Sequence, residues 1–379
     1  MHQDVLVAQP IPQFVSSLSR DDSGKAEVAK PPLSEITRKY AHANIGKACW
    51  QVLDTFIPYG VLWALMLHCV HQGYPYWITL ALALIAAGIL VRIFILFHDC
   101  CHGCFFPSRR ANTILGYVSG ILIFTPFEKW RYAHNVHHAT AGDLDRRGTG
   151  DIWTMTTEEY LAAPRRKRLA YRIYRNPFIL FIPGPILLFL FFQRFAGKDT
   201  QKRQRNNVAF TNLAILLVGV VVSFTIGLRT YLLIQFPVIA LAGSFGLWLF
   251  YLQHQFENVY WARHESWDPL RVALEGSSYL KLPKTLQWFT GNIGLHHIHH
   301  ARPTIPNYHL QQCYDETPAF QTVQPFTVRT SLKSLRLGLY DEEQKKLIGF
   351  RALRCTHGAA PWSRTPSNQE SNPQAEGTH

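Results

Sequence analysis

Three clusters of histidine stand out in this chain of 379 residues, and each has a spacing that suits metal coordination. The clusters are His98-Asp99-Cys100-Cys101-His102, His134-Asn135-Val136-His137-His138 and His296-His297-Ile298-His299-His300. Residues at i, i+3 and i+4 of a helix lie on one face. Eight imidazoles are therefore expected to converge in three groups, from His98, His102, His134, His137, His138, His296, His299 and His300.

Eight convergent imidazoles indicate two metal ions. A zinc ion takes four ligands in most sites, whereas a pair of first-row ions can use all eight. Imidazole favours iron, copper, zinc or nickel, and iron is the metal of this set that commonly activates dioxygen at open positions. Carboxylate ligands are compatible with the same pair. With 18 histidines in the chain, chance placement does not account for two H-x-x-H-H patterns and one H-x-x-x-H pattern.

Long apolar helices must position these clusters. The apolar residues gather into runs of about 20, the length that crosses roughly 30 Å of hydrocarbon. Four spans are predicted, at 49–70, 76–97, 208–227 and 231–252. The connections at 71–75 and 228–230 pair them into two hairpins. Two more apolar stretches, 111–127 and 177–195, carry internal glycine or proline and are predicted to be interfacial or re-entrant.

The charges place the clusters on one side of the membrane. The net charge is +13, and the Lys and Arg residues lie beside the apolar runs, which favours anionic lipid as the counter-charge and not nucleic acid. By the positive-inside rule, residues 98–207 and 253–355 and both termini are predicted to be cytoplasmic. Three of the seven cysteines are crowded at Cys100, Cys101 and Cys104, where geometry disfavours mutual bridging, so reduced thiols are expected.

The predicted fold class is an all-α integral membrane protein with four transmembrane helices, interfacial helices and a cytosolic cap. Residues 36–355 form this domain. Segments 1–35 and 356–379 are rich in polar residues and Pro and are predicted to be disordered.

Further residues are expected to support the metal site. His254 follows the fourth span at the level where the second span delivers His98, so it is predicted to be a ninth ligand, whereas His297 points roughly 100° away from its helical neighbours. Asn258 would lie one helical turn beyond His254. Carboxylates commonly orient metal-bound imidazoles. Of those near the clusters, Asp99 and Asp145 are singled out, ahead of Asp143, Asp151 and Glu257.

One charged residue inside a predicted span marks where that span leaves the membrane. Arg92 lies six residues before His98, and a long cationic side chain there is expected to reach towards the headgroups. The metals would then lie just outside the bilayer.

The clusters and their surroundings resemble membrane fatty acid desaturases. The three histidine boxes, HDCCHGCFF, GDLDRRGTGDIWTMTTEEY and QHQFEN are similar to bacterial acyl desaturases of the delta-12 (omega-6) group. Cys101 stands where a small glycine is usual. The resemblance implies a non-haem di-iron centre, dioxygen as oxidant, and removal of two hydrogens from an acyl chain, such as conversion of oleoyl to linoleoyl groups in membrane lipid. It also implies that a histidine outside the boxes is recruited, which supports His254.

Two other functions fit the same residues. A hydroxylase or ketolase, acting on lipid or carotenoid, would use the same scaffold. A metal carrier or membrane haem protein would instead place its ligands at mid-membrane. The sequence has no dinucleotide-binding G-x-G-x-x-G after a strand and no iron–sulfur cysteine spacing, so an external electron donor is expected, such as ferredoxin or a small cytochrome with its reductase.

Overall fold

The computed structural model describes residues 33–198 and 200–356. Most of this part of the chain is helical. The helices α1 to α9 are Leu33–Ile36, Ile45–His71, Tyr76–His102, Arg109–Leu122, Phe127–Thr140, Thr157–Ala162, Arg165–Tyr174, Pro177–Phe181 and Pro183–Ile186. The helices α10 to α18 are Lys202–Thr225, Leu228–His254, Pro269–Glu275, Lys284–Phe289, His296–Ala301, Asn307–Glu316, Pro318–Gln321, Val328–Ser331 and Phe350–Thr356.

Short 3-10 and π segments and five short strands complete the fold. The segments η1 to η5 are Thr37–Tyr40, Leu187–Phe191, Phe192–Arg194, His264–Ser266 and Leu332–Arg336. The strands β1 to β5 are Met155–Thr156, Tyr279–Leu280, Pro325–Phe326, Leu339–Asp341 and Lys346–Ile348. Strand β4 lies between β1, which is parallel to it, and β5, which is antiparallel; β2 pairs with β3 in parallel.

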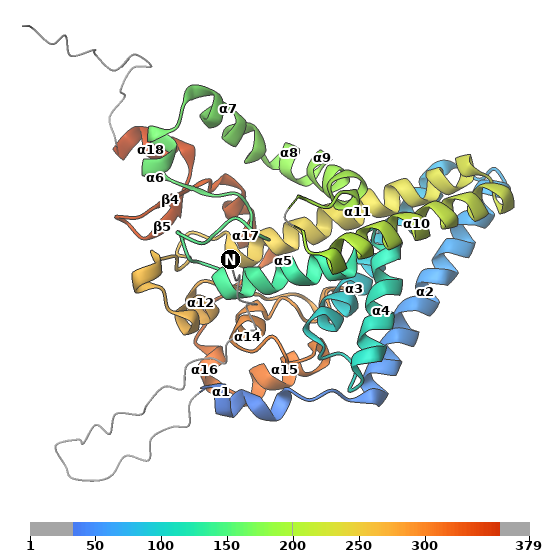
Figure 1. Ribbon diagram of the computed structural model, residues 1–379, viewed down its shortest axis with the longest axis horizontal. Helices are drawn as coiled ribbons and strands as arrows, with labels where there is room; N and C mark the ends of the chain where they lie inside the picture. The colour runs from blue at the N-terminus through green and yellow to red at the C-terminus, as the bar shows by residue number, and fades with distance from the viewer. Residues whose placement is uncertain (1–32, 199, 357–379) are drawn as a thin grey trace, which may run out of the picture.

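The four long helices α2, α3, α10 and α11 account for the four predicted spans. They project to one side of the molecule, and the short helices and strands gather at the other end (Figure 1). Helix α2 begins where the Asn44 side chain accepts a hydrogen bond from the Lys47 amide at 2.9 Å, and α3 is capped after His102 by Gly103, whose φ of 68° suits glycine. Helix α3 therefore runs through the whole first histidine cluster.

The second hairpin turns earlier than the apolar pattern predicts. Helix α10 ends at Thr225 and α11 begins at Leu228, so the reversal lies at Ile226 and Gly227. Gly227 has a φ of 83°, which an L side chain rarely adopts. The prediction of a turn at 228–230 was wrong because this glycine was counted into the preceding span.

Helix α3 is the centre of the long-helix layer. It packs against α2, α4 and α11, and its alanines Ala83, Ala86 and Ala87 are fully buried. Small side chains let helix backbones approach closely where lipid supplies no hydrophobic drive between helices. Helix α10 contrasts with it, since only 11% of the residues in its most apolar segment are buried inside the protein and Phe224 is 88% exposed. Such a surface is suited to lipid contact.

The two additional apolar stretches differ in structure. Helix α4 has 14 residues, too few to cross the hydrocarbon. The stretch Pro177–Arg194 is long and apolar enough to cross, and it joins α2, α3, α10 and α11 as a fifth candidate by length and composition. Its helix is interrupted at Ile182, between α8 and α9, and after α9 it continues as π and 3-10 turns. The count of four crossings and the cytoplasmic orientation stay predictions.

The domain boundaries also stay predictions. Most of the predicted disordered segments, at 1–32 and 357–379, lies outside the described residues, but α1 begins at Leu33 and α18 ends at Thr356. Six cysteines are free thiols, as the sequence predicts: Cys49, Cys69, Cys100, Cys101, Cys104 and Cys313.

Arg92 does not reach towards the headgroups. Its side chain is 3% exposed and donates to the Thr55 hydroxyl, to the Asp54 carboxylate at 3.3 Å and to the Trp288 carbonyl. The expectation was wrong because Asp54 on α2 supplies a partner inside the protein, and a cation paired with a carboxylate no longer needs water. This contact ties α2, α3 and α13 together just below the first histidine cluster.

Candidate metal centre

Nine histidines meet where two long helices end. Helix α3 ends at His102 and α11 ends at His254, so each helix delivers an imidazole from its last turn. Helix α5 carries the second cluster and α14 carries the third. The nine side chains divide into two groups whose ligand nitrogens lie within 4.8 Å of one another: His98, His102, His134, His138 and His299 in the first, and His137, His254, His296 and His300 in the second.

The first group joins the three clusters through short nitrogen contacts. The Nε2 atom of His299 lies 3.1 Å from that of His98 and 2.9 Å from that of His138, and the Nε2 atoms of His134 and His138 are 3.1 Å apart. Two imidazole nitrogens bound at about 2.1 Å to one ion stand about 3 Å apart when they subtend a right angle. These separations therefore suit ligands of a shared ion.

The second group is built around His254. Its Nε2 atom lies 3.1 Å from the Nε2 atoms of both His137 and His296, and the His300 ring centroid is 4.6 Å from its own. The structure thus brings all nine histidines singled out in the sequence together. Their role as ligands stays a prediction.

Burial keeps the imidazoles in the form that binds metal. His134, His138, His296, His299 and His300 have pKa values well below the ordinary value, first because they are buried and then because neighbouring imidazoles would repel a second charge. Neutral imidazole is the metal-binding form.

Unpaired nitrogens show that the site suits a bound ion. The Nε2 atoms of His102 and His300 are buried and have no hydrogen-bond partner. Buried polar atoms are nearly always paired, and an ion within each group would satisfy them. The first group offers five imidazoles and the second offers four. Imidazole nitrogen is a ligand that iron binds, so the residues present fit a di-iron centre.

Three acceptors hold imidazoles of this site by their second nitrogen. Asp99 accepts from His98 Nδ1 at 3.0 Å and from the Asn307 amides. Asp151 accepts from His137 Nδ1 at 2.6 Å, and the Gly276 carbonyl accepts from His254 Nδ1 at 3.0 Å. Such contacts fix the tautomer and the ring direction. Asp99 therefore lies where the sequence predicts an orienting carboxylate.

Asp151 is one of the carboxylates near the clusters that the sequence does not single out. Burial alone would raise its pKa, but hydrogen bonds from His137 and from the Gly148 amide outweigh burial and leave the pKa lowered. The turn that delivers it needs Gly150, which has a φ of 77° and whose added Cβ would lie 2.9 Å from the Ala133 carbonyl oxygen. The signal was present as Gly-Thr-Gly directly before Asp151.

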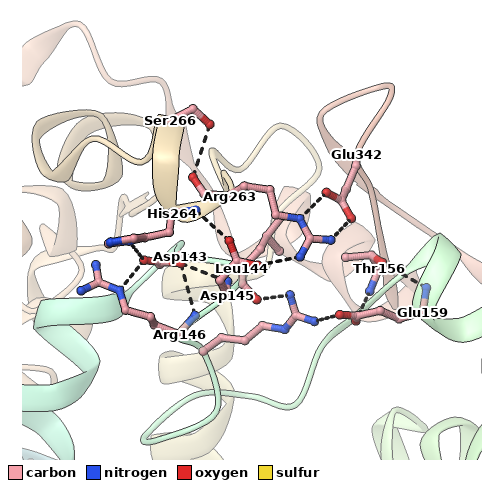
Figure 2. Close-up of polar contacts among 11 residues, drawn as sticks. Asp143, Leu144, Asp145, Arg146, Thr156, Glu159, Arg263, His264, Ser266 and Glu342 are labelled. Atoms are coloured by element: carbon pink, nitrogen blue, oxygen red, sulfur yellow. Dashed lines mark hydrogen bonds and ion pairs between the residues drawn. The ribbon is translucent and has the colours of Figure 1, made fainter.

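Asp145 lies elsewhere, in the network that Figure 2 shows. Its oxygens accept from Arg263 at 2.7 Å and from the His264 amide at 2.9 Å, and among the described residues no hydrogen bond joins it to a cluster histidine. Asp143 accepts from Arg146 and His264 in the same network. These carboxylates join the loop after α5 to the segment before α12. The choice of Asp145 was wrong because its carboxylate forms an ion pair with Arg263. Asp151, which follows the next turn, is the carboxylate that reaches His137.

Two more expectations concern α11 and α14. Helix α11 ends at His254, so Asn258 is not one helical turn beyond it and is exposed; the premise for Asn258 was wrong. His297 belongs to neither group. It packs against the rings of Tyr279 and Phe320, and burial lowers its pKa to about 4.

A cavity of about 540 Å³ leads to the second group. His137 and His254 line its buried end, and Ala162, Pro164 and Lys167, all exposed, line its other end. The remaining wall includes several apolar side chains: Ile152, Trp153, Met155, Phe250 and Trp261. The cavity can hold an apolar chain beside the imidazoles.

Comparisons with known proteins agree with this site. Residues 75–328 match the family model described as fatty acid desaturase. A protein named fatty acid desaturase from Bacillus subtilis (strain 168) is 46% identical over 85% of this chain and 91% of its own length. The sn-1 oleoyl-lipid 12-desaturase of Picosynechococcus sp. is 25% identical over 63% of this chain and 69% of its own length. The sn-2 acyl-lipid omega-3 desaturase (ferredoxin) of Helianthus annuus is 25% identical over 78% of this chain and 69% of its own length.

Replacing any one of the eight cluster histidines by Ala is expected to abolish activity and to lower the iron content, while the protein stays in the membrane. The predicted spans contain none of the eight, and each variant opens a coordination position. Metal analysis and turnover of membrane fractions would check this. A fully active variant would remove that histidine from the site.

His254→Ala is expected to lose iron and turnover, whereas His297→Ala keeps both once activity is normalised to folded protein. His254 contributes a nitrogen to the second group, and His297 does not. Two bound irons and normal turnover in His254→Ala would contradict its role. Iron loss confined to His297→Ala would reverse the assignment.

Asp151→Asn is expected to lower iron affinity or turnover by about 10- to 100-fold, the usual effect of removing a carboxylate that orients a metal-bound imidazole. Asp145→Asn is the matched control, since it makes the same change in the same loop without touching a cluster histidine. Iron titration of both variants measures the difference. Equal effects of the two substitutions would show that Asp151 acts through the loop and not through His137.

Proposed function

The chain belongs to the fatty acid desaturase family, and on that premise we propose that it inserts a second cis double bond into a monounsaturated acyl chain, converting oleoyl to linoleoyl groups in membrane lipid. The observation that carries this proposal is the cavity that reaches His137 and His254 and whose wall combines apolar side chains with polar ones such as Arg147, Glu159 and Gln255. Supporting it, the relatives from Picosynechococcus sp. and Synechocystis sp. are named sn-1 oleoyl-lipid 12-desaturases.

The nine imidazoles would hold two iron ions. When bound, these ions would allow dioxygen and two external electrons to oxidise the acyl chain. The protein's own residues position the ligands and the substrate. Asp99, Asp151 and the Gly276 carbonyl fix the ring directions of His98, His137 and His254. Because burial keeps the imidazoles neutral, the site needs no proton loss before metal binds.

The residues that line the cavity would determine which methylene groups of the acyl chain react. Phe250 lies on α11 one turn before His254, and its ring centroid is 5.4 Å from that of His137. Trp153, Met155 and Trp261 enclose the space further out. An acyl chain held against these rings presents a fixed segment to the imidazoles, since positioning is the main contribution that a binding site can make to such a reaction.

The substrate is proposed to enter from the membrane side of α6 and α7. The exposed end of the cavity is lined by Ala162, Pro164 and Lys167, at the junction of these helices. Beyond it α7 exposes Leu169 and Ile173, and α8 exposes Phe178. Exposed apolar side chains beside cations are typical of helices that lie at a membrane interface. A lipid there could pass one acyl chain inward while its headgroup stays at the surface.

The electron donor and the orientation are parts of the same proposal. A soluble or small membrane-bound carrier, ferredoxin or a cytochrome with its reductase, is proposed to deliver electrons on the cytoplasmic side. The relative from Helianthus annuus is named as a ferredoxin enzyme. The exposed cations Arg166 and Lys167 offer a surface for an acidic donor.

Expression of the chain in a host that contains oleoyl lipids is expected to yield linoleoyl groups, measured by gas chromatography with mass spectrometry of the total fatty acids. His254→Ala serves as the inactive control. Accumulation of only hydroxylated or keto products, or of only a new monoene, would contradict the delta-12 assignment.

A further inference from the structure

Helix α7 turns a buried face towards one wall of the cavity beside the imidazoles. Tyr171, Tyr174 and Arg175 stand at i, i+3 and i+4, so they share one side of the helix. Tyr171 is fully buried and Arg175 is 5% exposed, and neither lines the cavity. We propose that this face of α7 positions Trp153 in the cavity wall, and thereby determines which part of an acyl chain reaches the imidazoles. The inference rests on the proposed function, because it takes an acyl chain as the occupant of the cavity.

The wall in question is the segment 152–155, whose residues all line the cavity. Within this segment only Met155 belongs to a strand. The Trp153 amide donates to the Tyr174 hydroxyl at 3.2 Å, and the Met155 amide donates to the Tyr171 hydroxyl at 3.0 Å. Buried backbone amides need such partners, and here side chains of α7 supply them. The backbone of the wall is therefore held by α7.

The Trp153 ring is held as well as its backbone. Its centroid lies 4.9 Å from that of Tyr171, edge to face, and 5.6 Å from that of Tyr174. Such aromatic pairs have preferred geometries and restrict the direction of a ring. The Trp153 side chain is nevertheless 37% exposed and lines the cavity. It can therefore contact a bound chain while α7 sets its position.

Arg175 joins this wall to the end of α11. Its Nη1 atom donates to the Trp153 carbonyl at 3.4 Å and to the Thr154 hydroxyl at 3.3 Å. Its Nη2 atom donates to the Gln255 side-chain oxygen at 3.0 Å. Gln255 directly follows His254 and lines the cavity. One guanidinium group thus contacts both the wall and the residue next to an imidazole of the second group.

The other partners of Arg175 are also neutral. Its Nη2 atom donates to the Tyr251 hydroxyl at 3.0 Å and to the Leu337 carbonyl at 2.8 Å, and within residues 33–198 and 200–356 no carboxylate forms an ion pair with it. A buried cation without an anion is costly. What this side chain supplies is a planar set of donors in fixed directions, which a lysine lacks. Its role is therefore to position the segments that it joins.

The separation between the Trp153 ring and the imidazoles would decide which methylene group reacts. A chain that lies against Trp153 presents a fixed segment to His137 and His254, which line the same cavity. If the wall loosens, the chain can bind in more than one register. Positioning of this kind is sensitive, since a misplacement of about 1 Å can cost about 100-fold in rate.

The test compares Arg175→Lys with Arg172→Lys in a host that contains oleoyl lipids, with double-bond positions measured by gas chromatography with mass spectrometry. Arg172 lies on the same helix and donates to the Tyr160 hydroxyl at 2.6 Å, and not to the wall. Arg175→Lys is expected to lower the ratio of the main product to its positional isomers about tenfold, and Arg172→Lys is expected to leave this ratio unchanged. Iron content is expected to match the wild type in both, because no imidazole is altered.

Two further variants show whether Arg175 acts through the wall. Trp153→Ala is expected to shift the ratio in the same direction, and adding Arg175→Lys to it should change the ratio no further, because both residues act through one contact. Tyr174→Phe removes only the hydroxyl that accepts from the Trp153 amide, and it is expected to give a smaller shift in the same direction.

Several outcomes would overturn the inference. A purely structural role would lower the total product of Arg175→Lys and leave the ratio unchanged. Additive effects of Trp153→Ala and Arg175→Lys, or equal effects of Arg175→Lys and Arg172→Lys, would also exclude positioning through the wall. If Arg175→Lys does not accumulate in the membrane, an unchanged ratio in Tyr174→Phe is decisive against it. Failure of the wild type to form any diene would instead contradict the proposed function.

Discussion

The packing of nine imidazoles against one another is the constraint on which the rest of the structure depends. Six of the rings are buried, those of His102, His138 and His300 are partly exposed, and nitrogen atoms face one another at about 3 Å. Neutral rings at that distance cannot all be hydrogen-bond partners, because each has only one N–H. An arrangement of this kind is satisfied when cations occupy the spaces between the nitrogens. The surrounding helices must then be held in register closely enough to keep nine side chains pointing inward.

The long helices meet this requirement by ending at the site. Helices α3 and α11 each deliver a histidine in the last turn, α3 packs directly against α11, and both helices contain buried alanine. The buried pair of Arg92 and Asp54 fixes α3 relative to α2 close to the first cluster. On the other side, the loop carrying Asp151 and the network of Asp143, Arg146 and His264 hold the segments that follow α5 and α11. A membrane layer and a polar cap thus support the same set of rings.

Sequence periodicity identified the spans and the ligand candidates because both depend on local rules. The i, i+3, i+4 spacing and the apolar runs do not need the fold to be known. His254 was found from the span that precedes it. The partners of Asp145, Asp151 and Arg92 could not be found in this way, since each depends on a residue far away in the sequence: Arg263, His137 and Asp54. The exact ends of helices were the other source of error, as Asn258 and the turn at Gly227 show.

The central claim is that this chain holds two metal ions in two different sets of imidazoles. Mössbauer spectroscopy of the full chain expressed with iron-57 tests it most directly, because the spectrum counts distinct iron environments independently of substrate and donor. The account predicts about two irons per chain and two components of equal area, one for the group of five histidines and one for the group of four. A single iron per chain, or iron removed by mild chelation without loss of turnover, would contradict it.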